Sequence, residues 1–119
     1  MKRTVLVVDD HPSFRATARV LLEAEGYEVV GEAANGVSAI AAVKELRPAV
    51  VLLDVQLPDF DGFEVAARIL ASMNGDAPAI VMTSSRDAAD FGSLICDCGA
   101  CGFVAKGELS GAALATLLA

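Results

Sequence analysis

Short β-branched runs alternate with longer helical patterns along the whole chain, and this alternation limits the folds open to it. The second run is flanked by polar residues, which is typical of an edge strand. Parallel strands need long right-handed crossover connections, so repeated strand–helix units predict an α/β fold, a doubly wound parallel sheet with helices on both faces. The runs that predict strands are Thr4–Val8, Glu28–Glu32, Ala49–Leu53, Ala79–Met82 and Gly102–Ala105.

Apolar residues at helical spacing fill the gaps between these runs. Three helices are expected over 14–25, 37–46 and 63–73, the third with Asp61 as N-cap and Glu64 completing a capping box. A fourth, over 87–95, is weakened by Gly92, and Ser110 is placed to cap a fifth that runs through Leu118. The positions expected to face the core are Phe14, Ala18, Leu21, Leu22, Val37, Ile40, Val43, Leu46, Phe63, Ala66, Ile69, Leu70 and Met73.

Length and composition bound the class of protein. A chain of 119 residues with 55% apolar residues fits one folded domain, residues 1–119. No segment approaches the roughly 18 apolar residues of a membrane span, and no secretion signal is found, so a soluble cytoplasmic protein is expected. The net charge of −7 repels phosphate backbones, and we expect no direct binding of nucleic acid by this chain.

Three cysteines, Cys96, Cys98 and Cys101, lie close together in the sequence. An odd number of cysteines without a signal peptide predicts reduced thiols. Three thiolates could hold zinc, but the fourth ligand of a structural site is missing, because His11 is far away in the sequence. We therefore favour cysteines that behave as small hydrophobic residues, and keep the metal site as the alternative.

Polar side chains follow four of the five predicted strands directly. In a doubly wound sheet the binding site lies outside the carboxyl ends of the strands, so three carboxylates, hydroxyls and an ammonium are expected to meet at one rim. An exposed charge needs no explanation by itself, but Asp54 directly follows the most apolar stretch of the chain. The residues in question are Asp9, Asp10, Asp54, Thr83, Ser84 and Lys106.

Three clustered carboxylates need a partner, because two unit charges ~4 Å apart repel by about 4 kcal/mol at an effective dielectric of about 20. They must protonate, spread apart or bind a cation. All the ligands on offer are oxygen atoms, which predicts Mg²⁺. A Mg²⁺ beside a carboxylate, with a lysine and a hydroxyl nearby, is suited to phosphoryl transfer.

With these residues in place, the chain resembles the receiver (response-regulator) domain of two-component signal transduction over essentially its whole length. The resemblance implies a flavodoxin-like (βα)5 fold with strand order 2-1-3-4-5. The Asp-Asp-His opening, and Gly107 where many members have proline, are most similar to receivers of the nitrate-type helix-turn-helix regulators. The matching segments are VVDDH (7–11), LLDVQLPDFDG (52–62), MTS (82–84) and GACGFVAK (99–106).

The resemblance also implies roles for the acidic residues. Asp54 would accept a phosphoryl group from a sensor histidine kinase or a phosphotransfer protein. Mg²⁺ would be held by Asp9, Asp10, Asp54 and the backbone carbonyl of Gln56. A receiver of this kind is not an enzyme toward other substrates, since it catalyses its own phosphorylation and dephosphorylation.

The same resemblance implies a switch. Thr83 would hydrogen-bond a phosphoryl oxygen, Lys106 would form an ion pair with the phosphoryl group, and Phe103 occupies the position of the aromatic switch residue. Activation would reshape the surface of the fourth helix, fifth strand and fifth helix, where a homodimer partner or an output domain or protein would bind.

Several of these residues also have a plainer interpretation. From the residues alone, Phe103 on a buried strand is expected to belong to the core, and the family position is what favours a switch. Asp61 is fully explained as a helix cap, and His11 is expected to be structural or solvated rather than a metal ligand.

Two further functions remain open. A small Mg²⁺-dependent phosphohydrolase could also work through an aspartyl phosphate, but such enzymes generally carry an Asp-x-Asp motif after the first strand, which Asp9-Asp10-His11 lacks. A non-phosphorylated receiver-like interaction module is the other alternative. The intact set of Asp10, Asp54, Thr83 and Lys106 speaks against it.

Overall fold

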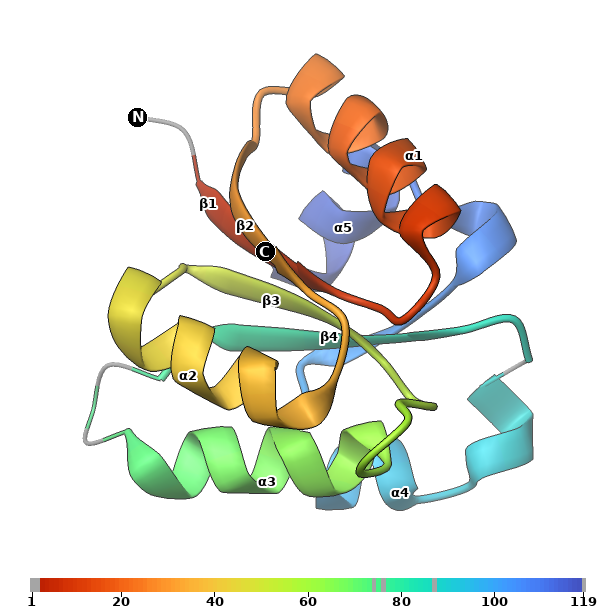
Figure 1. Cartoon of the computed structure of the whole chain (residues 1–119). Helices are drawn as coiled ribbons and strands as arrows, with labels where there is room; N and C mark the ends of the chain where they lie inside the picture. The colour runs from red at the N-terminus through yellow and green to blue at the C-terminus, as the bar shows by residue number, and fades with distance from the viewer. Residues whose placement is uncertain (1–2, 74, 76, 87, 119) are drawn as a thin grey trace.

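The architecture is a parallel sheet covered by helices on both faces, as a computed structural model of the chain shows (Figure 1). The structure describes residues 3–73, 75, 77–86 and 88–118. Within these residues, five strands form one sheet in the order β2-β1-β3-β4-β5, which confirms the predicted flavodoxin-like topology and the edge position of the second strand. The strands are β1 Thr4–Val8, β2 Glu28–Ala33, β3 Val50–Asp54, β4 Ala79–Ser84 and β5 Gly102–Ala105.

The helices lie in two layers. Figure 1 shows α2 and α3 on one face of the sheet and α1 and α5 on the other. None of the described helices is long and apolar enough to cross a membrane. The α-helices are α1 Pro12–Ala24, α2 Gly36–Leu46, α3 Gly62–Ser72, α4 Leu94–Asp97 and α5 Gly111–Leu118, with 3₁₀ turns η1 Ala88–Phe91 and η2 Lys106–Glu108.

Successive residues of the central strands pack into two different cores, because side chains alternate across a sheet. Leu6 and Val8 of β1 join the core beneath α2 and α3, whereas Val5 and Val7 join the core beneath α1 and α5. All four side chains are 0–1% exposed. Burial on both faces explains why these strands read as continuous apolar runs.

The predicted core faces of the first two helices are wrong at three positions. Leu21 is 38% exposed, Val37 62% and Leu46 41%. In α2 the expected pattern repeats every three residues and drifts around a helix with 3.6 residues per turn, so its two ends, Val37 and Leu46, leave the core. Ala39 and Val43 are the residues of α2 that are buried instead.

The fourth helix is also different from the prediction. Residues 88–91 form the turn η1 and α4 covers only Leu94–Asp97, while the predicted start, Asp87, lies outside the described residues. Gly92 separates the two pieces with φ +57°, a left-handed conformation that glycine adopts without steric cost and that a right-handed helix cannot include.

Two predicted helix caps are confirmed. The Asp61 carboxylate accepts a hydrogen bond from the Glu64 N–H at 2.8 Å, and the Ser110 hydroxyl accepts one from the Ala113 N–H at 3.0 Å. The Glu64 carboxylate does not complete a capping box: it pairs with Arg68 one turn further along α3, at 2.7 Å.

Cys98 and Cys101 have different surroundings. Cys98 is partly buried against the core beneath α2 and α3, and its thiol donates to the Ile95 carbonyl at 3.2 Å. Cys101 is exposed. Cys98 thus occupies the small hydrophobic role that was expected of it.

We expect Gly62→Ala to destabilise the fold by about 1–3 kcal/mol, because overpacking at a fixed backbone costs that much. A Cβ at Gly62 would lie 2.2 Å from the carbonyl oxygen of Asp54 and 2.9 Å from the Cα of Val55. Gly107→Ala is the matched control, since nothing lies within 4 Å of an added Cβ there. Urea unfolding of both variants measures the difference, and equal stabilities would contradict the close approach.

Candidate functional site

The carboxyl ends of β1 and β3 bring three carboxylates together. Asp9 and Asp10 follow β1, Asp54 ends β3, and the two strands are direct neighbours in the sheet. One ligand atom from each of these residues and from His11 lies within 4.8 Å of the others. Asp9 and Asp54 are 0% and 3% exposed, so two carboxylates of this cluster are held almost out of water.

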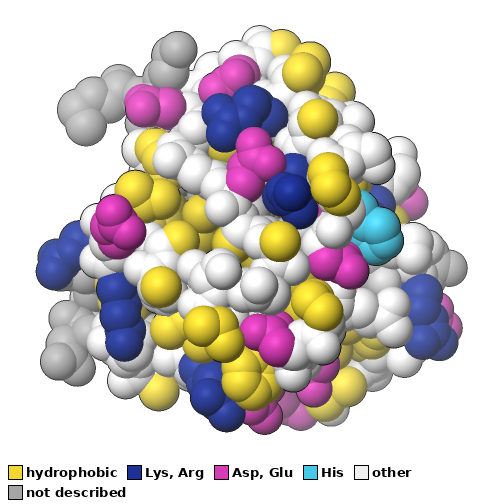
Figure 2. All heavy atoms as spheres, viewed as in Figure 1, with side chains coloured by type: hydrophobic (Ala, Val, Ile, Leu, Met, Phe, Trp, Pro, Cys, Tyr) yellow, Lys and Arg dark blue, Asp and Glu magenta, His cyan; other side chains and the backbone are white. Residues whose placement is uncertain are grey.

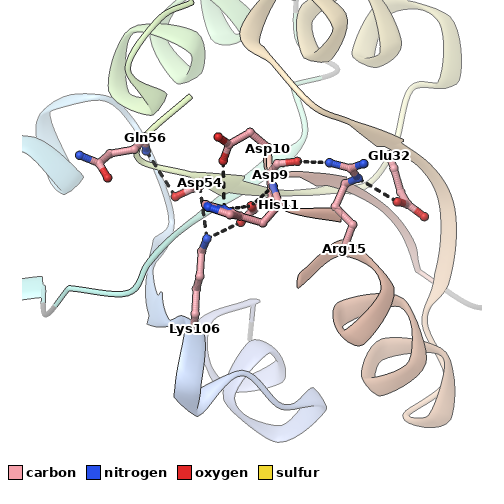
Figure 3. Close-up of polar contacts among 8 residues, drawn as sticks. All are labelled: Asp9, Asp10, His11, Arg15, Glu32, Asp54, Gln56 and Lys106. Carbon is pink, nitrogen blue, oxygen red and sulfur yellow. Dashed lines mark hydrogen bonds and ion pairs between the residues drawn. The ribbon is translucent and has the colours of Figure 1, made fainter. Parts of the chain in front are cut away.

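Lys106 is the internal counter-ion of the two buried carboxylates (Figure 3). Its Nζ lies 2.6 Å from Asp9 Oδ2 and 3.3 Å from Asp54 Oδ2. The same ammonium is 4.7 Å from the ring centroid of Phe14. Because an unpaired buried charge is costly, these contacts make the burial of Asp9 and Asp54 tolerable.

The environment shifts the ionisation of both ends of this contact. Burial, and then the charge of Asp9, raise the pKa of Asp54, while Lys106 and the Gln56 N–H pull it down by a smaller amount. Burial lowers the pKa of Lys106, but its contacts with Asp9 and Asp54 outweigh that effect, so the pKa lies above its ordinary value. Asp54 therefore carries its negative charge at an energetic cost that a cation would relieve.

The loop after β3 is tied down around Asp54. The Gln56 N–H donates to Asp54 Oδ1 at 3.3 Å, while the Gln56 side chain is exposed and points away from the carboxylates (Figure 3). Further along, Asp59 accepts hydrogen bonds from the N–H groups of Gly36 and Val37, at 2.7 and 3.0 Å. The bond from Gly36 is the main reason that the pKa of Asp59 lies below its ordinary value.

Thr83 lies beside Asp54 on the next strand and has an unusual environment. The two residues are partners in the parallel β3–β4 register. Thr83 is 0% exposed, and among the described residues its hydroxyl has no hydrogen-bond partner. A buried hydroxyl without a hydrogen-bond partner destabilises the folded state. A polar atom bound at the site could supply the missing hydrogen bond to Thr83.

Phe103 lies on β5 and is only partly buried. Its ring packs against Phe91 with a centroid distance of 5.8 Å, and Phe91 packs against Phe63 at 5.6 Å. Phe103 therefore contacts both the core beneath α2 and α3 and the η1 turn. The two interpretations of the sequence, core residue and switch residue, are both compatible with this position.

His11 lies beside the carboxylates of Asp9 and Asp10. Its Nδ1 is 3.0 Å from Asp9 Oδ1 and 3.1 Å from Asp10 Oδ1, and its backbone N–H donates to Asp9 Oδ1 at 2.8 Å. The side chain is 63% exposed, in agreement with a solvated residue. The geometry thus places a nitrogen at the edge of the carboxylate cluster.

The arrangement suits a hard divalent cation. Mg²⁺ binds through one or two carboxylates and keeps several waters, and this site offers carboxylate oxygens on an accessible edge. An anion bound next to the cation would meet the ammonium of Lys106 and the hydroxyl of Thr83. The cluster of Asp9, Asp10 and Asp54 is consistent with a metal site of this kind.

Two positioning contacts were missing from the sequence analysis. Asp59 joins the loop after β3 to the start of α2, and Arg15 of α1 donates to the backbone carbonyl of Asp9. Both are side chain–backbone hydrogen bonds, and Asp59 reaches its partner across 23 positions of sequence. No motif or periodicity marks such contacts.

Comparisons with known proteins agree on one family. The family model described as the response regulator receiver domain matches residues 5–117. BvgA of Bordetella pertussis is 41% identical over 108 residues, which cover 91% of this chain and 51% of BvgA. Response regulator GacA of Pseudomonas aeruginosa is 36% identical over 104 residues, 87% of this chain and 48% of GacA. The chain thus spans about half the length of the curated relatives it matches.

Solved structures give the same result. The signal receiver domain of NarL from Mycobacterium tuberculosis superposes with a TM-score of 0.83 at 33% identity, over 98% of this chain and 97% of that one. A LuxR-family two-component response regulator from Aurantimonas sp. SI85-9A1 gives a TM-score of 0.86 at 31% identity, over 99% and 86%. These matches confirm the expected similarity to the nitrate-type regulators.

We expect Asp54→Asn to be more stable than the wild type at pH 7 in metal-free buffer. The pKa of Asp54 is raised above its ordinary value of 3.8, so the folded state favours the protonated form. Its contribution to stability is fully present below pH 3.8 and is lost as the pH rises through the folded-state pKa. The difference in melting temperature between the two proteins should therefore shrink as the pH falls.

Asp59→Asn is the control, for which the expected change in stability has the opposite sign. The pKa of Asp59 is lowered, so its stabilisation is present above the ordinary pKa and is lost as the pH falls through the folded-state value. This variant should be less stable than the wild type at pH 7. An Asp54→Asn variant that is also less stable there, or whose difference does not change with pH, would contradict the electrostatics described for Asp54.

Proposed function

The chain belongs to the response regulator receiver domain family, and from this premise we propose that Asp54 is its phosphoacceptor in two-component or phosphorelay signalling. One observation carries the proposal. The Asp54 carboxylate is nearly buried at the end of a core strand, beside two other carboxylates and 3.3 Å from the ammonium of Lys106. That is the set of groups that an aspartyl phosphate needs.

The phosphoryl group would come from the phosphohistidine of a sensor histidine kinase or a phosphotransfer protein. A carboxylate oxygen of Asp54 attacks phosphorus, the P–O bond forms as the P–N bond breaks, and the imidazole leaves with the electron pair and takes up a proton. Lys106 then pairs with the phosphoryl oxygens, and the Thr83 hydroxyl donates to one of them. Water later hydrolyses the acyl phosphate, so the protein returns to its starting state without acting on another substrate.

Asp9, Asp10, Asp54 and the backbone carbonyl of Gln56 are the residues that we propose to hold Mg²⁺. A Mg²⁺ bound there would supply positive charge to offset that of the phosphoryl oxygens. The all-oxygen set of carboxylates supports this choice of metal. The raised pKa of Asp54 supports it too, because a cation offsets both the burial and the repulsion from Asp9.

Phosphorylation would act as a switch through Thr83 and Phe103. Movement of the Thr83 hydroxyl toward the phosphoryl group would free space for the Phe103 ring, which contacts η1 through Phe91. The surface of α4, β5 and α5 would change, including the hollow lined by Phe103, Glu108 and Leu117. We propose this surface as the contact for a homodimer partner, an output domain or an output protein, in the cytoplasm.

Intact-mass spectrometry after incubation with acetyl phosphate tests the proposal. The wild type should gain the mass of one phosphoryl group in the presence of Mg²⁺ and should show no gain when EDTA is added. The Asp54→Asn variant should show no gain even with Mg²⁺. Asp90→Asn is the matched control, an exposed carboxylate that pairs with Arg86 at 3.6 Å and should not affect the adduct.

Two results would contradict the proposal. Turnover of phosphate esters without a stable adduct would favour the Mg²⁺-dependent phosphohydrolase. A folded protein that shows neither adduct nor turnover would favour the non-phosphorylated interaction module.

A further inference from the structure

The backbone of Asp9 is held from two sides, through the peptide groups before and after it. Its N–H donates to the carbonyl of Ala33 on β2 at 3.0 Å. Its carbonyl accepts from Nη1 of Arg15 on α1 at 2.5 Å. At Asp9 the chain passes from β1 into the loop that carries Asp10 and His11, so these two bonds fix the backbone from which the carboxylates project.

Arg15 is itself held in place by Glu32. Its Nε donates to Glu32 Oε1 at 3.0 Å, as Figure 3 shows, and the Arg15 side chain is only 16% exposed. Glu32 lies opposite Val7 in the β1–β2 register, one position from the pair formed by Val8 and Ala33. The guanidinium therefore links α1, β2 and the end of β1 at one point.

A second arginine shares the same carboxylate without reaching the loop. Arg19 Nε donates to Glu32 Oε2 at 3.0 Å, and its guanidinium also lies 3.6 Å from Glu23 and donates to the Val29 carbonyl. Figure 2 shows dark blue and magenta side chains alternating along this face as far as the histidine. Arg15 and Arg19 thus have the same ion-pair partner, but among the contacts above it is Arg15 that binds the Asp9 carbonyl.

We propose that Arg15, oriented by Glu32, is a positioning residue for the cation and phosphoryl site. This inference rests on the proposed function of that site, and it adds a residue that orients the carboxylates without binding the cation itself. A metal needs its carboxylates at fixed directions, and groups that orient the ligands affect metal affinity strongly. The fork of a guanidinium can bind a carboxylate and a carbonyl at once, which a lysine ammonium does with less geometric control.

The pair of arginines provides the test. Mg²⁺ is titrated into the wild type, Arg15→Met and Arg19→Met, and the amide signals of residues 9–11 are followed by NMR, together with the melting temperature of each variant. Arg15→Met should weaken Mg²⁺ binding by about 10–100-fold, the range found for residues that orient metal ligands. Arg19→Met should leave the affinity nearly unchanged, although it removes an ion pair to the same Glu32.

Glu32 supplies a second comparison. Glu32→Gln keeps an acceptor for Arg15 and should retain more Mg²⁺ affinity than Glu32→Ala. Equal weakening by Arg15→Met and Arg19→Met, or no weakening by either, would overturn the positioning role and leave a structural ion-pair cluster.

Amide hydrogen exchange of residues 8–11 separates this proposal from the function on which it rests. A wild type that binds no Mg²⁺ would overturn the proposed function. Hydrogen exchange alone would then test whether Arg15 holds the backbone of Asp9. Faster exchange in Arg15→Met than in Arg19→Met supports the positioning role of Arg15, whereas equal exchange overturns it.

Discussion

The rest of the site depends on the burial of two carboxylates, Asp9 and Asp54, side by side at one edge of the sheet. Moving a charge out of water costs several kcal/mol unless a partner compensates it. Lys106 supplies that partner from the end of β5, with its ammonium between the two carboxylates. The neighbouring strands β1 and β3 leave these side chains little freedom to move apart. This edge of the sheet therefore carries more negative than positive charge, an excess that a cation bound together with a phosphoryl group can offset.

Other contacts around the site hold the residues that carry this excess negative charge in position. Gly62 lets the loop after β3 return to within van der Waals distance of the Asp54 backbone, and Asp59 ties the same loop to α2. Arg15 holds the backbone of Asp9 from the opposite side. The burial of like charges that these contacts maintain reduces the stability that the chain could otherwise reach, a common feature of sites that must react. The raised pKa of Asp54 is the direct sign of that cost.

The sequence predicted the parts of the structure that depend on local patterns. Apolar runs located the five strands, and the residues after those runs, Asp9, Asp54, Thr83 and Lys106, do come together or lie on neighbouring strands. The strand order came from the family resemblance and not from the pattern itself. The predicted core face of α2 was wrong at Val37 and Leu46, because a three-residue spacing does not follow a helix.

Contacts between distant side chains and the backbone could not be predicted in this way. Arg15 could be read as an ordinary surface arginine, and its partner Glu32 lies 17 positions away on an edge strand. The break of the fourth helix depends on the left-handed φ of +57° at Gly92, whereas helix propensity predicts only that glycine weakens the helix. His11 was expected to be structural or solvated, and its side chain is 63% exposed, but its 3.0 Å contact with Asp9 could not be predicted from the sequence.

A crystal structure of the chain with Mg²⁺ and beryllofluoride, an analogue of the phosphoryl group, tests the central claim most directly. The account predicts beryllofluoride on Asp54, Mg²⁺ on Asp9, Asp10 and Asp54, and the Lys106 ammonium moved from Asp9 to a fluoride. Beryllofluoride bound elsewhere, or a Lys106–Asp9 contact that persists unchanged beside a bound adduct, would contradict it.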